Sequence, residues 1–390
     1  MKKFIAIVLL SVLILSFVLT GCGSTNSYAI KNENVITIGV IASQSEESLY
    51  SSKVLDGINY ASELASIVNM NGKYSIMLSV HDVNGNISDI ASDLINDKVA
   101  AVICATESKA KSEEIVKAFD DYDTPLLFVD CYSNEVINDE ESFVLSVPYS
   151  YQASVAASYF TNEGYKNGTV IYADDDYSSA FADLFTNTFT STEGTNINKI
   201  SEYDAQNIAS GNSEFVFIIG DAEYSNNVYS DLKFYEAKMP VMISEVFNKS
   251  FYENTEFNDM LYISKFESDV NNYIGADFYS VFSTTKGINK DDVTAAQAYG
   301  YDAYMLVYGA LMGFGSSYSA VSEGTDTQKN EITTTDVKTA ISEIVQLGVT
   351  DSINFYMSGL VNTNFVYVRA IQNSQSVMIN KYDYTNESTK

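Results

Sequence analysis

The sequence predicts an α/β protein with two doubly wound lobes, each built on a parallel sheet that helices cover on both faces. Short apolar runs alternate with amphipathic stretches from Val35 onward, and the same alternation restarts near Ser150. The short links between these segments imply crossover connections, which make neighbouring strands parallel. Ligands bind beyond the carboxyl ends of the strands in open α/β sheets, so two facing lobes predict a binding cleft between them.

The first unit opens with VITIGVIA, which is typical of a buried strand at 35–42. Apolar residues then follow helical spacing from Val54 to Val68, and Asn71-Gly72 supplies a turn. The continuing pattern predicts, in order, a strand at 74–80, a helix through 87–95, a strand at 99–105, a helix through 115–119 and a strand at 125–131.

The second unit repeats this order from a helix at about 150–160. It continues with a strand at 168–173, a helix around 181–189, and strands at 214–220 and 239–244 with a helix between them. The remaining segments are predicted to be helices at about 270–283 and 293–313, a polar loop at 320–333, a helix at 335–346, and antiparallel strands near 352–357, 364–371 and 376–381.

The first 21 residues are typical of an export signal. Lys2 and Lys3 precede an apolar run, Phe4 to Leu19, that is too short for a comfortable membrane span. The run closes on Leu19-Thr20-Gly21-Cys22, which resembles the bacterial lipoprotein signal and implies a diacylglyceryl group on Cys22. An ordinary secretory peptide with an incidental cysteine, or an uncleaved anchor, is the alternative.

If the lipoprotein interpretation holds, the chain is exported and held at the outer face of the cell membrane, at the cell surface or in the periplasm. Residues 22–34 are small and polar without periodicity, and we predict that they form a flexible tether.

The acidic composition limits the classes of partner. The formal net charge is −29, and a strongly acidic surface repels both nucleic-acid phosphates and anionic lipid headgroups. We therefore expect no nucleic-acid partner, and the lipid on Cys22 must do the anchoring. The charge also has a simpler explanation, because it favours solubility.

Cysteine and histidine are too sparse for the usual metal and redox sites. Cys104 and Cys131 end apolar runs, and they either pair or remain free buried thiols. His81 is the single histidine and stands in a strand-like run, where a structural role is ordinary. The adjacent carboxylates Asp174-Asp175-Asp176 are expected to diverge into solvent. We predict no metal and no cofactor.

The chain resembles the leucine/isoleucine/valine-binding proteins, the type 1 solute receptors that deliver amino acids to ABC importers. The resemblance covers about residues 35–385. It is carried by the order and spacing of ITIGVIA, Asp56-Gly57, DKVAAVICATESKAKS, TPLLFVD, SVPYSYQASVAASY, VIYADDDYSSAFADLF, ISEVFNKS and YGYDAYMLVYGAL.

The resemblance implies the type 1 periplasmic-binding-protein fold, in which three crossings join the lobes. One lobe would combine residues 35–147 and 272–350, and the other would combine 148–271 and 351–390.

The resemblance also implies a set of ligand-binding residues. The ligand carboxylate would meet the hydroxyl of Ser108 and the N–H groups that begin the helix after the third strand, where an anion is favoured. The alternative is that Ser108 serves only as the cap of that helix. Glu245, within SEVFNKS, would hold the ligand ammonium, because a desolvated cation needs a counter-charge. Tyr50 would close the cleft and Tyr177 would line it from the second lobe, although either ring can be ordinary packing.

Several positions depart from the family pattern. Asp130, Cys131 and Tyr132 follow the fourth strand where the family has small residues, and Tyr132 replaces a threonine that often touches the ligand. Asp221 stands where a tyrosine is usual, and Glu107 precedes Ser108 where the branched-chain receptors are uncharged. These acids suggest a ligand that is more cationic or polar than leucine, unless Glu107 and Asp221 point to solvent.

The sequence thus favours a monomeric substrate-binding lipoprotein of an ABC importer. It would capture an amino acid or related small amine by hinge closure and deliver it to a membrane permease. The alternative is a ligand-sensing surface receptor of the same fold that reports to a signalling partner. An enzyme is not expected, because the chain has no Gly-rich phosphate loop and no cluster of histidines or cysteines.

Overall fold

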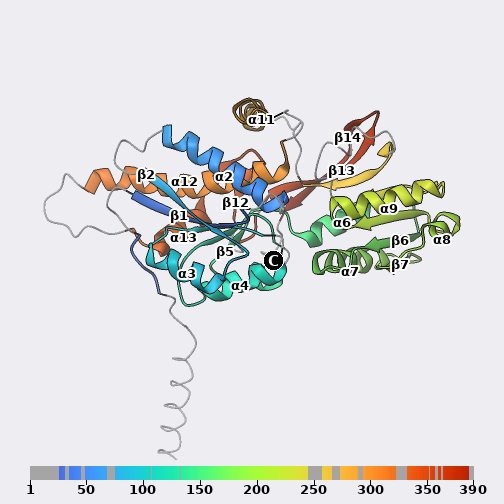
Figure 1. Ribbon diagram of the computed structural model, residues 1–390, viewed down its shortest axis with the longest axis horizontal. Helices are drawn as coiled ribbons and strands as arrows, with labels where there is room; N and C mark the ends of the chain where they lie inside the picture. The colour runs from blue at the N-terminus through green and yellow to red at the C-terminus, as the bar shows by residue number, and fades with distance from the viewer. Residues whose placement is uncertain are drawn as a thin grey trace, which may run out of the picture.

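The computed structural model describes residues 26–30, 35–44, 49–67, 75–106, 108–131, 133–244, 257–265, 273–288, 293–321, 332–350, 352–355, 359–361 and 363–385. Over these residues the chain forms two α/β lobes that lie beside each other along the long axis of the molecule (Figure 1).

The first lobe is built on a parallel sheet with strand order β2-β1-β3-β4-β5. Side chains alternate across it, since Val40 and Ile103 pack on one face and Ile41 and Cys104 on the other. The strands are β1 (Val35–Ala42), β2 (Ser75–Asp82), β3 (Val102–Ala105), β4 (Leu126–Phe128) and β5 (Ser142–Val144).

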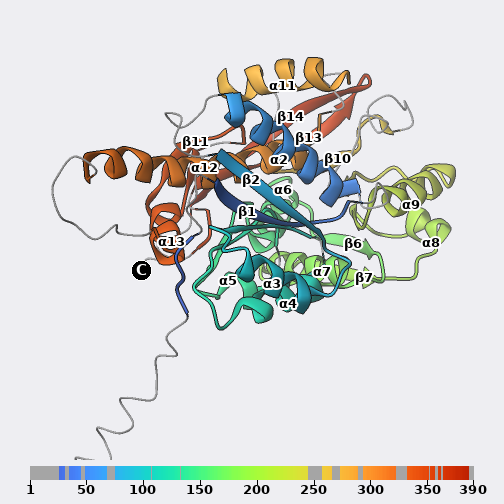
Figure 2. The same ribbon diagram turned by 60° about the vertical axis from the view of Figure 1, so that its left-hand side comes forward.

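Helices cover both faces of this sheet. One layer holds α3 (Ile87–Asn96), α4 (Lys109–Phe119) and the short α5 (Asn134–Ile137), and the other holds α2 (Leu49–Ile67) with α12 (Ala295–Val321) and α13 (Thr334–Glu343). Side-chain caps fix where some of these helices begin. Asn86 accepts from the backbone N–H groups of Ser88 and Asp89 at the start of α3, and Thr333 and Asp336 form a capping box at the start of α13. The distant segments α2 and α12 lie side by side in both views (Figures 1 and 2).

The second lobe is built on a sheet with strand order β14-β13-β10-β9-β8-β6-β7. It is parallel from β7 to β10 and antiparallel at β13 and β14. The strands are β6 (Asn167–Tyr172), β7 (Asn196–Ile200), β8 (Phe215–Ile219), β9 (Val241–Ile243), β10 (Leu261–Ser264), β13 (Thr363–Gln372) and β14 (Gln375–Thr385).

The helices of the second lobe also form two layers. The face carrying Phe215 and Phe217 packs on α6 (Tyr149–Asn162) and α7 (Asp176–Thr190), where the rings of Phe160 and Phe215 stack with centroids 3.8 Å apart. The opposite face, with Val216 and Ile218, packs on α8 (Ala205–Ser210) and α9 (Ala222–Phe234). Both lobes are therefore doubly wound, and the predicted fold class is confirmed.

The predicted division of the chain differs from the structure near residue 351. Ile353, Phe355 and Val361 pack in the core of the first lobe, and the rings of Phe143 and Phe355 lie 5.1 Å apart. Ile353 belongs to β12 (Ser352–Asn354), which pairs with β11 (Val345–Leu347) in a two-stranded antiparallel sheet. The described residues up to 361 thus pack with the first lobe, because their apolar side chains fill its core, and the chain enters the second sheet only at β13.

The flexible tether predicted for 22–34 is wrong over its described residues, 26–30. Ile30 is buried, its N–H donates to the carbonyl oxygen of Ile332 at 3.0 Å, and the N–H of Thr334 donates to the carbonyl oxygen of Tyr28 at 3.0 Å. The segment is ordered because Ile30 packs in the core of the first lobe, and the hydroxyl of Tyr28 donates to the carbonyl oxygen of Val99 and accepts from Thr124. The signal segment and Cys22 lie outside the described residues.

None of the helices in the described part of the chain combines the length and the apolar character that a membrane span requires.

Candidate functional site

The carboxyl ends of both sheets carry buried polar side chains. Asp130 follows β4 in the first lobe, and Ser244 and Lys265 follow β9 and β10 in the second lobe. Each of these three residues is at most 4% exposed. Buried polar groups are costly unless they are paired, so their concentration here marks the part of the fold where polar chemistry is retained.

Asp130 and Lys265 form an ion pair between the lobes. The ammonium of Lys265 donates to Oδ2 of Asp130, and the two side chains are 2% and 5% exposed respectively. Ser146 donates its hydroxyl to Oδ1 of Asp130 at 2.5 Å, and the hydroxyl of Tyr50 lies 3.5 Å from Oδ2. Donors from its own chain therefore surround the Asp130 carboxylate on both oxygens.

Aromatic rings enclose the Lys265 end of the pair. The ammonium of Lys265 lies 5.5 Å from the ring centroid of Tyr149, at the start of α6, and Tyr299 of α12 donates its hydroxyl to the Lys265 carbonyl oxygen at 3.1 Å. The rings of Tyr149 and Tyr177 meet edge to face at 5.1 Å. The structure thus brings Asp130 and Tyr50 together directly, and Tyr177 reaches the same group through Tyr149.

Sequence reasoning missed Lys265. It follows a strand of four residues that the apolar pattern did not predict, so nothing placed it at a carboxyl end. One feature of the sequence could have indicated Lys265: it is a lysine directly after the apolar run LYIS, in a chain where basic residues are outnumbered by acidic ones, 22 to 51.

Ser108 caps α4. Its hydroxyl accepts from the backbone N–H of Lys111 at 3.3 Å, its own N–H donates to Oγ1 of Thr106 at 3.1 Å, and its side chain is exposed. The capping role that the sequence left open is present in the structure, and a ligand contact by the same hydroxyl stays a prediction. Glu245, Tyr132 and Glu107 lie outside the described residues.

Asp221 is an exposed N-cap. It begins α9 by accepting from the backbone N–H of Tyr224 at 2.7 Å. Lys265 balances the charge of Asp130. Of the four acids that suggested an unusually cationic ligand, Asp130 and Asp221 therefore no longer support that suggestion. An exposed cap and a matched ion pair add no net negative charge to a closed cleft.

The two cysteines of the described chain are free and buried, as one of the two sequence alternatives had it. Burial raises the pKa of the Cys104 thiol, with a smaller contribution from Cys131. Burial likewise raises the pKa of Cys131 to about 12. A thiol that stays protonated is a poor nucleophile, which argues against cysteine chemistry at this site.

A separate cavity of about 400 Å³ lies at the amino end of β9, bordered by Lys233, Lys238, Met239, Pro240 and Asp259 among others. Because Pro240 precedes β9 and Lys265 follows β10, this cavity and the ion pair are at opposite edges of the second sheet. It therefore lies outside the predicted cleft.

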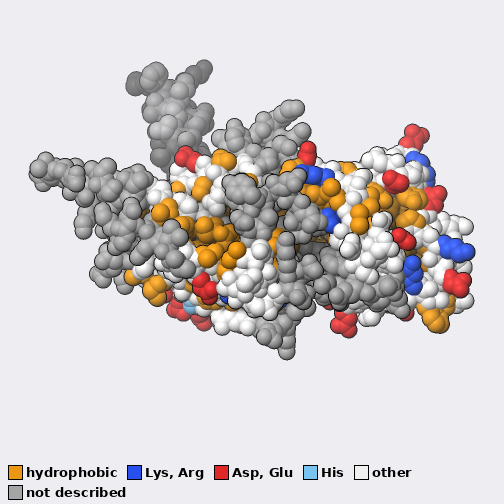
Figure 3. Space-filling view, turned by 90° about the horizontal axis from the view of Figure 1, so that it is seen from above, with side chains coloured by type: hydrophobic (Ala, Val, Ile, Leu, Met, Phe, Trp, Pro, Cys, Tyr) orange, Lys and Arg blue, Asp and Glu red, His pale blue; other side chains and the backbone are white. Residues whose placement is uncertain are grey.

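The side chains visible in Figure 3 show acidic and basic groups scattered singly, with no continuous basic stripe among those drawn in colour.

Comparison with known proteins identifies the fold. Residues 62–216 match the family model described as "Receptor family ligand binding region". No curated protein matches the chain by sequence.

Solved structures match over nearly the whole chain. A leucine-binding protein from Thermotoga maritima shares 18% identity, with 90% of this chain and 99% of that chain covered and a TM-score of 0.72. A branched-chain amino-acid transporter substrate-binding protein from Streptococcus pneumoniae, in complex with isoleucine, shares 14% identity over 90% and 99% of the two chains, with a TM-score of 0.72. A solute-binding protein of an ABC transporter from R. palustris, in complex with 4-hydroxybenzoate, shares 15% identity over 91% and 99%, with a TM-score of 0.74.

These similarities show that the chain has the type 1 periplasmic-binding-protein fold, and the resemblance found in the sequence is confirmed at that level. The first of these structures is described as a leucine-binding protein and the other two as substrate- or solute-binding proteins of transporters, and none of the three is described as an enzyme.

Proposed function

We propose that the chain is the substrate-binding lipoprotein of an ABC importer, which captures an amino acid or a related small amine between its lobes and hands it to a membrane permease. The observation that carries the proposal is the ion pair of Asp130 and Lys265, which joins the carboxyl ends of the two sheets. Such a contact exists only when the lobes lie close together, so it belongs to the closed state of a hinged receptor.

Hinge closure gives this pair a role in ligand capture. A solute that binds one lobe gains further contacts only after closure, and any interaction unique to the closed state shifts the population toward it. The ion pair with Lys265 adds such an interaction from the protein itself. We propose that Asp130, Tyr50 and Tyr177 border the ligand, with Ser108 at the carboxylate end and Glu245 at the ammonium end.

The buried hydroxyl of Ser244 supports a polar ligand at this edge. Its Oγ has no hydrogen-bond partner among the residues that the structure describes, and it stands directly before Glu245 at the end of β9. A buried hydroxyl is usually satisfied, and a ligand oxygen or nitrogen would satisfy this one.

We also propose that lipid on Cys22 holds the receptor at the outer face of the membrane. The anchor raises the effective concentration of the receptor around its permease. This role needs no catalytic group, and the buried cysteines and the balanced Asp130–Lys265 pair offer none.

A thermal-shift screen of residues 24–390 tests the ligand class. The panel contains amino acids, their amides, polyamines and aromatic carboxylates. A true ligand at 100 times its Kd should stabilise the protein by about 2.7 kcal/mol. The matched control is Glu245→Ala, which should lose the shift for amines and retain its unliganded melting temperature. A panel that shifts nothing would remove the solute-receptor proposal.

A second candidate is a surface receptor that senses the same class of ligand. The matched family model describes a receptor ligand-binding region, which is the observation that favours it. Affinity purification of the anchored protein separates the two functions. Recovery of a permease and an ATPase supports transport, and recovery of a signalling protein without them supports sensing.

A further inference from the structure

The first crossing between the lobes passes from one core to the other within three residues. Leu145 is fully buried in the core of the first lobe, and its N–H donates to the carbonyl oxygen of Phe128 at 2.9 Å. Val147 is fully buried in the core of the second lobe. Because packing holds both neighbours of Ser146, rotation of one lobe against the other along this crossing is confined to the backbone bonds about Ser146.

The third crossing leaves the first lobe beside the first crossing. The N–H of Val144 donates to the carbonyl oxygen of Gly359 at 2.7 Å, and the N–H of Val361 donates to the carbonyl oxygen of Val144 at 3.0 Å. Gly359 has a φ of 66°, and a Cβ on it would lie 2.2 Å from the carbonyl oxygen of Ser142, so this pairing requires glycine. Val361 packs in the first core and Val366 in the second. The chain is therefore fixed to the first lobe as far as Val361 and changes core only beyond that residue.

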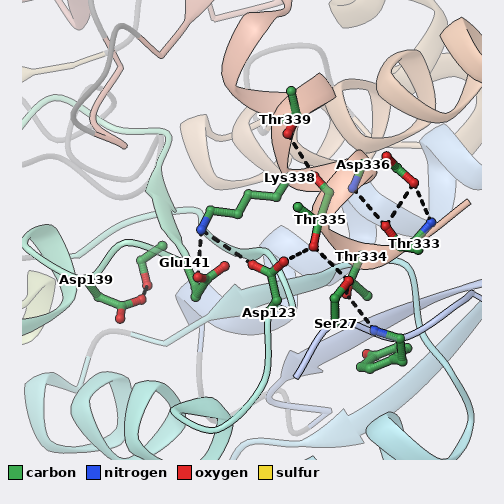
Figure 4. Close-up of polar contacts among 12 residues, drawn as sticks. Ser27, Asp123, Asp139, Glu141, Thr333, Thr334, Thr335, Asp336, Lys338 and Thr339 are labelled. Atoms are coloured by element: carbon green, nitrogen blue, oxygen red, sulfur yellow. Dashed lines mark hydrogen bonds and ion pairs between the residues drawn. The ribbon is translucent and has the colours of Figure 1, made fainter. Parts of the chain in front are cut away.

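The strand that leads into the first crossing, β5, is anchored at its start (Figure 4). Lys338 of α13 reaches the carboxylate of Glu141 at 2.6 Å and that of Asp123 at 3.5 Å. Ser142 donates its hydroxyl to Oδ2 of Asp139 at 2.6 Å. All of these residues belong to the first lobe, so the contacts fix β5 to that lobe and leave the bending to the chain that follows it.

One carboxylate of the first lobe receives donors from two crossings. Ser146, in the first crossing, donates its hydroxyl to Oδ1 of Asp130 at 2.5 Å. Lys265 stands directly after β10, where the second crossing begins, and donates its ammonium to Oδ2 of the same side chain. The two donors occupy different oxygens, so the bond from Ser146 orients the carboxylate and leaves Oδ2 for the ion pair.

We propose that Ser146 is the pivot residue of the hinge and a positioning residue of its closed state. Its hydroxyl bond to Asp130 fixes the backbone where the first crossing turns, and the same bond presents the carboxylate to Lys265. Closure thus engages the first and second crossings at one side chain. Loss of the Ser146 hydroxyl frees both the pivot and the carboxylate, which favours the open state. This inference rests on the hinged receptor of the proposed function.

The test measures the separation of the lobes directly. Glu114 of α4 and Asn187 of α7 are exposed positions on helices of opposite lobes. Cysteines introduced at both positions carry spin labels, and pulsed dipolar spectroscopy gives the distribution of the distance between them without added ligand. The chain is the one used in the ligand screen, and its own cysteines, Cys104 and Cys131, are 0% and 3% exposed and stay unlabelled.

Ser146→Ala should raise the ratio of open to closed molecules about tenfold, because a hydrogen bond to a charged group is lost. The added open molecules appear as a component at longer distance. Ser142→Ala is the matched control: its hydroxyl also donates to a carboxylate, and the two serines are 2% and 1% exposed, but Ser142 and its partner both lie in the first lobe. The control should leave the distances unchanged. Equal distributions in the two alanine variants would overturn the proposal.

A second background separates positioning through Asp130 from local packing. In Asp130→Leu with Lys265→Met the acceptor of the Ser146 hydroxyl is absent, so adding Ser146→Ala should not change the distances. A further shift to long distances in that background would show that Ser146 acts through another group, and it would contradict the proposal.

No solute enters this measurement, so its outcome is separate from that of the ligand screen. A screen in which nothing binds would remove the proposed function, whereas the response of the hinge to Ser146→Ala would stand. Unchanged distances in Ser146→Ala would remove the pivot while leaving the identity of the ligand to the screen.

Discussion

In the hinged receptor proposed above, the pair of Asp130 and Lys265 differs from an ordinary buried ion pair because hinge motion would control its contact with water. In a rigid core, removing one partner leaves an unpaired buried charge and costs about 3–5 kcal/mol. Here the lobes can separate, and separation returns the lone charge to solvent. The loss of one partner should therefore change the conformation more than the stability.

Lys265→Met should open the protein. We expect a larger radius of gyration by small-angle X-ray scattering, a Kd weakened about tenfold through loss of about 1.4 kcal/mol of closed-state stabilisation, and a smaller loss of unfolding free energy than a rigid buried pair would show. The double variant Asp130→Leu with Lys265→Met removes both charges and should be compact again. A single variant as compact and as tight-binding as the natural protein would contradict the role of the pair in closure.

Glu141 should make stability depend on pH in the neutral range. Burial, opposed by Lys338 and assisted by Asp123, raises the pKa of Glu141 to about 7. The folded state then binds this proton more tightly than the unfolded state, where the pKa is about 4.5, so the contribution of Glu141 to stability grows as pH falls from above 7 toward about 4.5. Asp123 acts in a lower range, because its pKa is lowered and its stabilisation is lost only in acid.

Glu141→Gln should abolish the neutral-range dependence. The amide resembles the protonated acid, so the variant should be more stable than the natural protein by roughly 1 kcal/mol at about pH 8 and equal to it near pH 5. Urea denaturation at the two pH values measures this, and the exposed neighbour change Glu140→Gln should leave the pH dependence as it was. An unchanged slope in Glu141→Gln would show that another group titrates there.

The sequence could predict individual site residues only where a local motif or the family resemblance gave their position. Asp130 and Tyr50 were singled out because the resemblance supplied positions for them; the structure places them in contact, and their role in ligand binding stays a prediction. The partner of Asp130 was invisible, since the pairing joins residues 135 positions apart through a fold contact. The cysteines remained ambiguous for the same reason, because spacing along the chain does not reveal burial or distance.

At the scale of elements, the close contact of α2 and α12 rests on two glycines. A Cβ on Gly57 would lie 2.0 Å from the carbonyl oxygen of Gln297, and a Cβ on Gly300 would lie 2.1 Å from the carbonyl oxygen of Val54. Each helix thus presents a glycine to the backbone of the other. The spacing of the two helices follows from the missing side chains.

Gly57→Ala and Gly300→Ala should each destabilise the protein by about 1–3 kcal/mol or more, because backbone must move to admit the methyl group. Gly313→Ala is the matched control in the same helix, where nothing lies within 4 Å of the added Cβ. It should be neutral or stabilising by up to about 1 kcal/mol. Denaturant titration measures all three, and equal effects in α12 would refute the close-contact explanation.

Elements with strong periodicity were predicted, and several short ones were missed. The strands β5, β7 and β10 hold only three to five residues, and β7 is half exposed and polar, so no apolar run announces it. The order of residues 26–30 was missed because Tyr28 and Ile30 stand in an otherwise polar stretch. Tertiary contacts, which no window of sequence contains, decide both cases.

At the scale of the whole molecule, the core of each lobe includes an element from a distant part of the chain. The first lobe needs α12, and the second needs β13, whose Val366, Val368 and Ala370 lie in its core. The chain therefore crosses between the lobes three times, and neither lobe is formed by one continuous segment.

A chain ended at residue 362 tests this dependence. It retains the parallel strands of the second sheet and loses β13 and β14. We expect the first lobe to unfold cooperatively and the second to show hydrogen exchange without lasting protection, since β10 would become an unfinished edge. Full protection of β6 and β8 in the shortened protein would show that the second lobe is autonomous.

The interleaved order of the chain has a consequence for the export that the proposed function requires. Neither sheet can gather its full core until residues far downstream have emerged, so the growing chain stays incompletely folded for most of its synthesis. A threading channel accepts only such a chain. The same topology that joins two lobes around a hinge would thus delay folding until translocation is nearly finished, without any need for a separate unfolding step.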